Sequence, residues 1–156
     1  MLDKDPIKAA EMQCDKHCIK MVLDTAQLLS SAMHLTGSIG PYQPCYLNHP
    51  CTEWAAESRQ NFDWLKAHGL ALASEYTHRY GKVHLSTDCI RSCSNTSIAD
   101  RSATPPVLAM PEFCRLADPV EAYRMYYNTI KYKIAVWTNR NVPEWFRPHM
   151  YIGRHE

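Results

Sequence analysis

The chain has 156 residues, of which 46% are hydrophobic and 21% charged, and its 17 Lys and Arg against 16 Asp and Glu give a formal net charge of +1. This composition is typical of one globular domain spanning residues 1–156 and excludes an intrinsically disordered chain. The near-zero charge excludes attraction of nucleic acid or an anionic membrane through an overall field, so any basic surface is local. No apolar run reaches bilayer length and the N-terminus lacks a signal-peptide pattern, which predicts a cytoplasmic protein with no membrane partner.

The first predicted helix begins at Asp5-Pro6, where an Asp N-cap precedes a proline at the first helical position. Apolar residues at helical spacing extend it from Ile7 to about Met33 and predict that most of it is buried. Asp15 falls on the apolar side, where a carboxylate needs hydrogen bonds, a metal or the N-terminus of a neighbouring helix. The remaining polar strip runs along the axis and consists of His17, Lys20, Asp24 and Gln27. Such a strip can line a cleft, or it can be a solvated face of salt bridges.

Residues 36–50 are rich in Gly and Pro and predict a long loop. Asn48-His49-Pro50 begins a second helix, which Gly81 ends. The apolar stripe of this helix is flanked by polar side chains at helical spacing, namely Glu57, Asn61, His68, Glu75 and Arg79. A short helix is predicted from Asp88 to Cys93, followed by an irregular segment up to Pro111.

Asp118-Pro119 opens a third long helix, again with an N-cap before a first-turn proline. The core face of this helix is predicted to run from Tyr123 through Ile130 to Trp137, and a final helical turn to begin at Pro143. Three principal helices joined by long irregular loops make a mainly α, compact single-domain fold.

The seven cysteines predict reduced thiols. Their number is odd, and Cys14/Cys18 and Cys89/Cys93 have four-residue helical spacing, from which unstrained disulfides rarely form. Free cysteine is commonly buried, so most of these side chains are expected in the core. The zinc ligands that the chain could offer are Cys14, His17, Cys18, Cys45, His49 and Cys51. Their spacing matches no strong zinc template, and we predict neither a metal nor another cofactor.

The end of the second helix gathers side chains suited to nucleic acid. Arg79, Lys82 and His84 are cationic or can become so, and Tyr80 lies among them, which suits a phosphate beside a stacked base. The alternative is a C-terminal cap in which the basic residues complement the helix dipole.

The C-terminal stretch alternates basic and aromatic residues. The basic residues are Arg124, Lys131, Lys133, Arg140, Arg147 and Arg154, and the aromatic ones are Tyr126, Tyr132, Trp137, Trp145, Phe146 and Tyr151. Rings that stack on bases and cations that contact phosphates make a nucleic-acid surface, although helical spacing also predicts that many of these rings belong to the core.

Motifs of several large enzyme classes are missing from the sequence. It contains no P-loop, no Gly-x-Gly-x-x-Gly, no Gly-x-Ser-x-Gly and no His-Glu-x-x-His. Nucleotide hydrolases, Rossmann oxidoreductases and the common hydrolases are therefore not expected.

Most of the chain resembles a group of uncharacterised proteins from tailed bacteriophages. The resemblance rests on Asp5-Pro6, Cys14-Asp15-Lys16-His17, Lys20-Met21, Gln27-Leu28-Leu29-Ser30, Asn48-His49-Pro50, Trp54, Glu57-Ser58, Asn61, Trp64-Leu65, Glu75-Tyr76-Thr77 and Arg79-Tyr80-Gly81-Lys82. It implies a viral gene product that works inside an infected bacterium and assigns no activity.

A more distant resemblance is to the bacteriophage pyrimidine-dimer DNA glycosylases of the endonuclease V type, which are small all-helical proteins. Asp15-Lys16-His17, with Asp24 seven residues after His17, resembles that family's early helix, in which an Asp-x-His stretch precedes a catalytic glutamate by the same interval. The helix from Phe62 to Arg79 and the segment Pro143-Glu144-Trp145-Phe146 follow in the family's order.

In that family the terminal α-amine attacks the deoxyribose carbon to form an imine, and the glutamate stabilises the sugar cation and assists elimination. The resemblance implies that Asp24, one methylene shorter, takes the carboxylate role while His17 and the basic groups hold DNA. In this chain a helical segment separates Met1 from His17, and Leu2 is expected to keep Met1 in place.

We therefore predict a phage-type DNA-processing protein, most specifically a base-excision glycosylase and AP lyase with DNA as its partner. The alternatives are a non-catalytic module that binds a host or viral protein, and an enzyme acting on a nucleotide or another small phosphorylated molecule. The predicted catalytic residues are His17, Asp24 and Glu57, and the predicted substrate-binding residues are Lys20, Asn48, His49, Asn61, Arg79, Tyr80, Lys82, His84 and Trp145. A cleft that gathers these residues would favour an active site.

Overall fold

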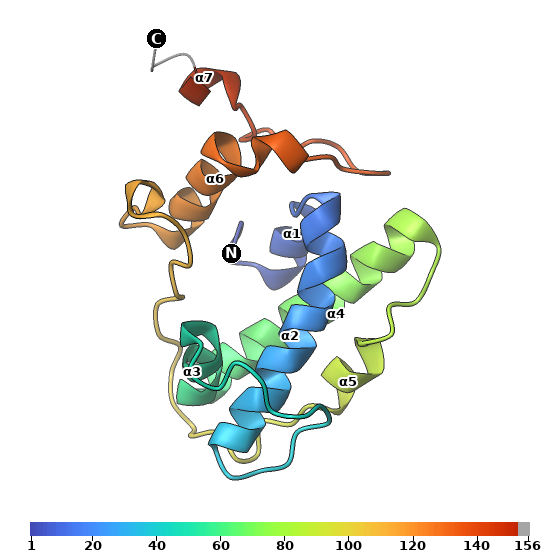
Figure 1. The fold of residues 1–156 in the computed structure, drawn as a ribbon, viewed down its shortest axis with the longest axis vertical. Helices are drawn as coiled ribbons and strands as arrows, with labels where there is room; N and C mark the ends of the chain where they lie inside the picture. The colour runs from blue at the N-terminus through green and yellow to red at the C-terminus, as the bar shows by residue number, and fades with distance from the viewer. Residues whose placement is uncertain (153–156) are drawn as a thin grey trace.

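The computed structural model describes residues 1–152, and every regular element in them is a helix (Figure 1). The α-helices are α1 (Pro6–Glu11), α2 (Asp15–Leu35), α3 (Pro50–Glu57), α4 (Arg59–Tyr80), α5 (Thr87–Ser92), α6 (Pro119–Thr129) and α7 (His149–Ile152), with the 3-10 helices η1 (Glu112–Cys114) and η2 (Lys131–Ile134). The predicted mainly α fold is confirmed. Residues 153–156, with Arg154 of the predicted basic stretch, lie outside the described residues.

The prediction of one continuous first helix is wrong, because the chain breaks between α1 and α2. Asp5 caps α1 as predicted, since its side chain accepts from the N–H groups of Ile7 and Lys8. After α1, the Arg79 guanidinium donates to the carbonyls of Glu11 and Gln13 at 3.0 and 2.8 Å. These contacts satisfy carbonyls that a continuing helix would have used, and the apolar periodicity runs on through the break without revealing it.

The second predicted helix is also two helices, α3 and α4, which meet at Ser58. Ser58 is extended (φ −148°, ψ 149°) and its Oγ accepts from the Asn61 N–H at 3.0 Å, so it is a new N-cap. The ends of the pair agree with the sequence: His49 caps α3, and α4 stops at Gly81 in the left-handed region (φ +67°).

Helix α6 ends earlier than predicted, at Thr129. The chain continues through η2, and the Trp137 indole donates to the Met12 carbonyl at 2.9 Å, which holds this segment against the α1–α2 break. The helical turn predicted to begin at Pro143 is a single turn, in which the Phe146 N–H donates to the Pro143 carbonyl at 2.9 Å. The last helix, α7, begins only at His149.

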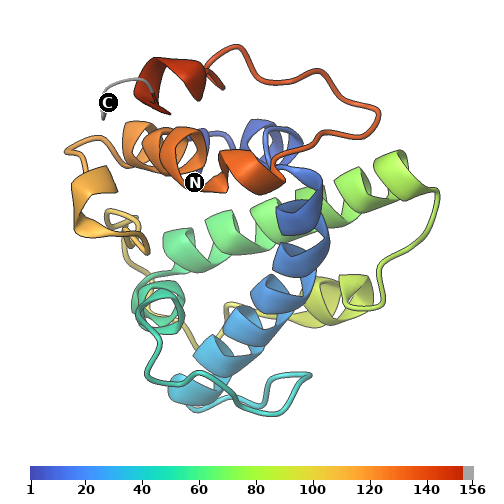
Figure 2. The ribbon, with the colours of Figure 1, turned by 45° about the horizontal axis from the view of Figure 1, so that its top comes forward.

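The main core lies where α2 crosses α4 (Figure 2). Gly69 of α4 permits this crossing, because a Cβ there would be 2.5 Å from Thr25 Cγ2 and 3.1 Å from Ile90 Cδ1. A second cluster joins the N-terminus to the C-terminal third and is formed by Leu2, Cys14, Tyr127 and Trp137.

All seven cysteines are free, and five of them are buried, as predicted. No helix within residues 1–152 is long and apolar enough to cross a membrane. Over the same range, no three His, Cys, Asp or Glu side chains are placed to hold a metal ion.

Candidate active site

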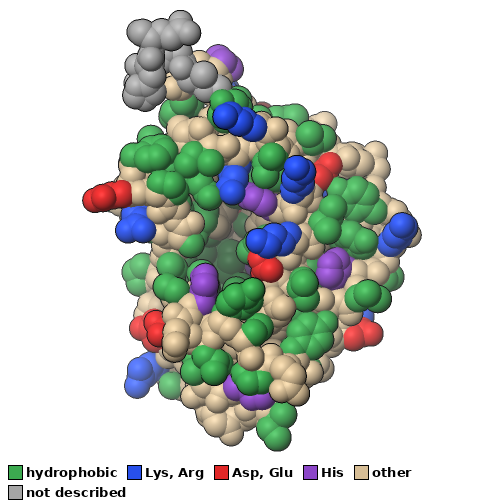
Figure 3. Space-filling view, in the orientation of Figure 1, with side chains coloured by type: hydrophobic (Ala, Val, Ile, Leu, Met, Phe, Trp, Pro, Cys, Tyr) green, Lys and Arg blue, Asp and Glu red, His purple; other side chains and the backbone are tan. Residues whose placement is uncertain are grey.

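A pocket of about 550 Å³ lies between α2, α3, α4 and α6. Figure 3 shows a hollow in the middle of one face, with a hydrophobic floor and with basic, His and acidic side chains at its rim. The polar strip of α2 lines the pocket with His17, Lys20, Asp24 and Gln27. Of the two interpretations of this strip, the structure therefore favours the cleft.

Asp24 and Lys20 form one polar edge of the pocket. Lys20 Nζ lies 3.8 Å from Asp24 Oδ2, one turn away on α2. The Lys20 side chain is 72% exposed and that of Asp24 only 30%, so the cation stands outside and the carboxylate deeper. A pair this open adds little to stability and leaves Asp24 available to a ligand.

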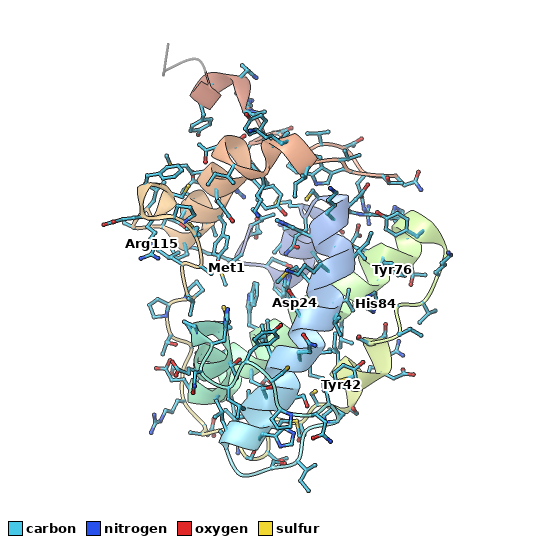
Figure 4. All side chains as sticks on the ribbon, viewed as in Figure 1. Met1, Asp24, Tyr42, Tyr76, His84 and Arg115 are labelled. Atoms are coloured by element: carbon cyan, nitrogen blue, oxygen red, sulfur yellow. The ribbon has the colours of Figure 1, made fainter. Side chains whose placement is uncertain are left out.

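Met1 lines the same pocket as Asp24. Figure 4 shows both residues in the middle of the molecule, whereas Tyr76 and His84 lie on the other side of α2. Burial disfavours the ammonium form and lowers the pKa of the Met1 α-amine to about 5, against a smaller opposing effect of Cys51. The amine is therefore neutral at pH 7.

Three contacts hold the N-terminal segment in this place. The Leu2 side chain is buried in the second cluster, and its carbonyl accepts from Arg124 Nε at 3.1 Å. The Lys4 carbonyl accepts from Trp64 Nε1 at 2.8 Å. The helical segment that separates Met1 from His17 along the chain thus folds back, and both residues reach one pocket.

His17 is held by Tyr127 of α6, whose hydroxyl lies 2.6 Å from His17 Nδ1. The pKa of His17 is lowered to about 4, chiefly by burial and to a smaller extent by the positive charges of Lys131 and Lys20. His17 is therefore a neutral imidazole at pH 7.

A second neutral histidine, His68, lies in the pocket wall. Its Nδ1 is 3.0 Å from the Pro6 carbonyl, an acceptor, so Nδ1 carries the proton and Nε2 accepts from the Gln13 amide at 3.0 Å. Burial lowers the pKa of His68 to about 4. The ring also stacks on Trp64, with centroids 4.9 Å apart. These contacts fix the wall on which the N-terminal segment packs.

Aromatic rings make up much of the remaining wall. Trp54 and Trp64 come from α3 and α4, and both indole N–H groups donate to backbone carbonyls, which fixes the rings. Tyr123 and Tyr126 come from α6, and Lys131 Nζ stands 5.0 Å from the Tyr126 ring centroid. Fixed rings below cations can receive a planar base attached to a phosphate backbone.

Comparison with known proteins gives one match. A family model described as pyrimidine dimer DNA glycosylase matches residues 3–88, more than half of the chain. The chain belongs to the pyrimidine dimer DNA glycosylase family. No curated protein and no solved structure matches.

The part of this glycosylase-family chain that the model matches contributes only one side of the pocket. His17, Lys20, Asp24, His49 and the two Trp residues lie within residues 3–88. The opposite side comes from later in the chain and includes Tyr123, Tyr126, Tyr127 and Lys131, with Pro106, Val107 and Ala109 before them. The family resemblance alone therefore does not describe the whole site.

Two conspicuous residues, Asp15 and Arg79, form a buried ion-pair network outside the pocket. Arg79 Nη1 donates to Asp15 Oδ1 at 3.0 Å, and its Nε donates to Glu75 at 3.1 Å. Thr138 donates to Asp15 through N–H and hydroxyl, so Asp15 has the hydrogen bonds that its place on the helix demands. Burial opposes ionisation of Asp15, but the bonds from Thr138 and Arg79 outweigh it and lower its pKa.

Other predicted site residues near α3 are placed in structural contacts. Asn61 is fully buried, and its amide donates to the Trp54 carbonyl at 2.9 Å, while its Oδ1 accepts from the Thr104 N–H. Glu57 is exposed and accepts from the Thr104 hydroxyl at 3.0 Å. Asn48 is exposed and does not line the pocket, whereas the neighbouring His49 does.

The basic helix end forms a separate cluster. His84 and Tyr80 both pack on Tyr76, with centroids 5.0 and 5.3 Å from that ring, and Lys82 is exposed. Trp145 packs on Tyr127 and lines a different, open groove of about 890 Å³. The structure therefore does not bring these residues together with Asp24.

Sequence reasoning did not single out Met1, Gln13, Cys51, Trp64 or Tyr127 as part of one site. For the α6 side of the pocket the sequence did carry a signal. Tyr123 and Tyr127 are four residues apart and share a helical face, and Tyr126 and Lys131 lie close to them along the chain. For Met1 no local signal exists, since its place depends on contacts with α4 and α6.

Proposed function

We propose that this member of the family is a base-excision DNA glycosylase and AP lyase, and that the pocket is its active site. The observation that carries the proposal is a buried amine, neutral at pH 7, in one pocket with the Asp24 carboxylate and the neutral His17. Amine and carboxylate are the two groups that imine chemistry at a deoxyribose needs.

In the proposed reaction, the lone pair of the amine forms a bond to C1′ of the damaged nucleotide. The bond from C1′ to the base breaks, and the base leaves with the electron pair and takes up a proton. The attached nitrogen then loses one proton, and its lone pair opens the C1′–O4′ bond while O4′ takes up a proton, which gives a protonated imine. A proton then leaves C2′ and the 3′ phosphate departs, which nicks the strand.

Asp24 is suited to two parts of this sequence. Its negative charge stabilises the positive charge that develops on the sugar, and its oxygens can accept a proton. His17, neutral, is suited to donate a hydrogen bond to a substrate oxygen. Lys20 and Lys131 line the same pocket near His17, where they can contact phosphates that flank the reacting nucleotide.

Borohydride trapping on UV-irradiated duplex DNA tests the proposal. We expect a covalent adduct and strand nicking with irradiated DNA, and neither with intact DNA. Mass spectrometry of the adduct peptide identifies the attacking amine, and we expect the peptide that contains Met1 rather than those of Lys20 or Lys131. The absence of both adduct and nicking would contradict the glycosylase proposal and favour a protein-binding module or an enzyme of small phosphorylated molecules.

A further inference from the structure

Tyr127 is a buried tyrosine that the chemistry above does not use. It is 4% exposed and lies on α6, beyond the residues that the family model matches. Its hydroxyl is 2.6 Å from His17 Nδ1 and 3.4 Å from the backbone N of Cys14. Its ring meets the His17 ring edge-on, with centroids 5.2 Å apart at 80°. The contact therefore fixes the imidazole both by packing and by a short hydrogen bond.

The direction of the hydrogen bonds follows from the donors present. The Cys14 N–H can only donate, so the Tyr127 oxygen is its acceptor. The hydroxyl proton can then point at His17 Nδ1, which at 2.6 Å is a stronger acceptor than the Cys14 thiol that also adjoins the hydroxyl. A neutral imidazole that accepts at Nδ1 carries its proton on Nε2. Within residues 1–152 no protein acceptor bonds to Nε2, which leaves this N–H for a ligand.

The groups around His17 favour the same neutral form. Lys20 lies on the same helix, Lys131 on η2, the Met1 amine comes from the N-terminus, and Tyr127 faces it from α6. Cys14 is the remaining titratable neighbour at the Tyr127 hydroxyl, and it is fully buried. At pH 7 the charged groups among these are the Lys20 and Lys131 ammonium ions, which oppose an imidazolium ion, while the Met1 amine is neutral.

We propose that Tyr127 is a positioning residue, which orients the His17 ring and keeps its proton on Nε2, facing the pocket. The effect on catalysis rests on the proposed function, in which His17 donates to a substrate oxygen. The hydrogen-bond arrangement itself does not depend on any activity.

Nuclear magnetic resonance of the histidine ring nitrogens tests the arrangement. Long-range ¹H–¹⁵N correlation, with His17 assigned by its loss in His17→Gln, should give the Nε2–H form in the unaltered protein at pH 7. A proton on Nδ1 would overturn the proposal without any Tyr127 variant. In Tyr127→Phe we expect the Nδ1 resonance to move and the titration midpoint of His17 to rise above pH 4. An unchanged Nδ1 resonance and midpoint would also overturn it.

Kinetics test the consequence. We expect Tyr127→Phe to lower kcat about tenfold with little change in KM, because an interaction used only in the transition state is weakened. The same substitution in a His17→Gln background should cost nothing further, since Tyr127 acts through His17. Tyr42→Phe, which also removes one hydroxyl hydrogen bond but lies outside the pocket, is the matched control and should retain full activity.

The outcomes separate the two proposals. A full additional loss from Tyr127→Phe in the His17→Gln background, or an unchanged kcat in the single variant, contradicts the positioning role. If the unaltered protein neither nicks nor traps damaged DNA, the glycosylase proposal fails, while the ring-nitrogen spectra still decide the arrangement of Tyr127 and His17.

Discussion

Among single residues, Met1 and Asp24 owe their proposed roles to a difference in environment. The amine is buried, which keeps it neutral, whereas Asp24 stands near an exposed lysine at the pocket edge. A neutral nucleophile and a carboxylate can therefore face the same sugar without first forming an ion pair that would have to be broken.

Asp24→Asn removes the negative charge at nearly constant shape. We expect the rate of strand nicking to fall by about 10²- to 10⁴-fold, the range for a lost acid–base group. The amide neither stabilises the positive charge on the sugar nor accepts a proton. Thermal unfolding should change little, since Asp24 makes only a long ion pair with an exposed lysine. Asp88→Asn, at an exposed position, is the control; equal nicking by both variants would exclude Asp24 from catalysis.

The pH dependence of trapping reports the amine directly. An amine attacks only when deprotonated, and burial lowers the pKa of the Met1 amine to about 5. Adduct formation with cyanoborohydride should therefore rise through about pH 5 and be level by pH 7. A rise centred near pH 8, the ordinary range of an α-amine, would show that the attacking group is not buried.

At the scale of elements, the fold depends on how closely α2 and α4 approach. Gly69→Ala places a methyl group 2.5 Å from Thr25 Cγ2. One of the helices must shift, and we expect a loss of about 1–3 kcal/mol in the free energy of unfolding, as for other overpacked cores. Urea denaturation measures this loss. Ser74→Ala, on the exposed face of α4, should stay within about 0.5 kcal/mol, and an equal effect of both variants would mean that the crossing is not tight.

The sequence was most informative about the ends of helices. Asp5-Pro6, His49-Pro50, Gly81 and Asp118-Pro119 all mark ends that the structure has, because caps act through neighbouring backbone groups. The break within the first predicted helix was missed because contacts such as the one from Arg79 to the Gln13 carbonyl join residues far apart in sequence. The break at Ser58 has a local cap, but the polar and apolar periodicity continues across it.

The structure brings together only part of the predicted site, because local spacing does not reveal contacts between distant parts of the chain. His17, Lys20 and Asp24 follow from helical spacing alone. Arg79 and Asn61 have the residue types of a binding site, yet they make buried structural contacts. Composition does not distinguish these two uses of a polar side chain, since both need hydrogen-bond partners.

At the scale of the whole molecule, Arg79 joins three separate parts of the chain. Its guanidinium binds the α1–α2 break and Glu75 of α4, and Glu75 in turn binds Arg140. Arg79→Ala would remove one partner from each of the carboxylates Asp15 and Glu75 and the donor to the carbonyls of the α1–α2 break, and we expect a loss of about 3–5 kcal/mol in the free energy of unfolding. Arg91→Ala, which removes an exposed pair, should cost under about 1 kcal/mol in the same denaturation experiment. Similar losses in the free energy of unfolding for the two variants would mean that the buried network stabilises the fold no more than an exposed ion pair does.

The contact between Leu2 and Arg124 also sets an order of events during synthesis. These residues are 122 positions apart, so α6 leaves the ribosome long after Leu2 does. Until α6 packs against the N-terminal segment, the Met1 amine stays in water with the basicity of an ordinary amine and is mostly protonated. If the amine acts as we propose, we therefore expect a nascent or truncated chain to form imines more slowly at pH 7 than the folded protein, in which most of the amine is neutral.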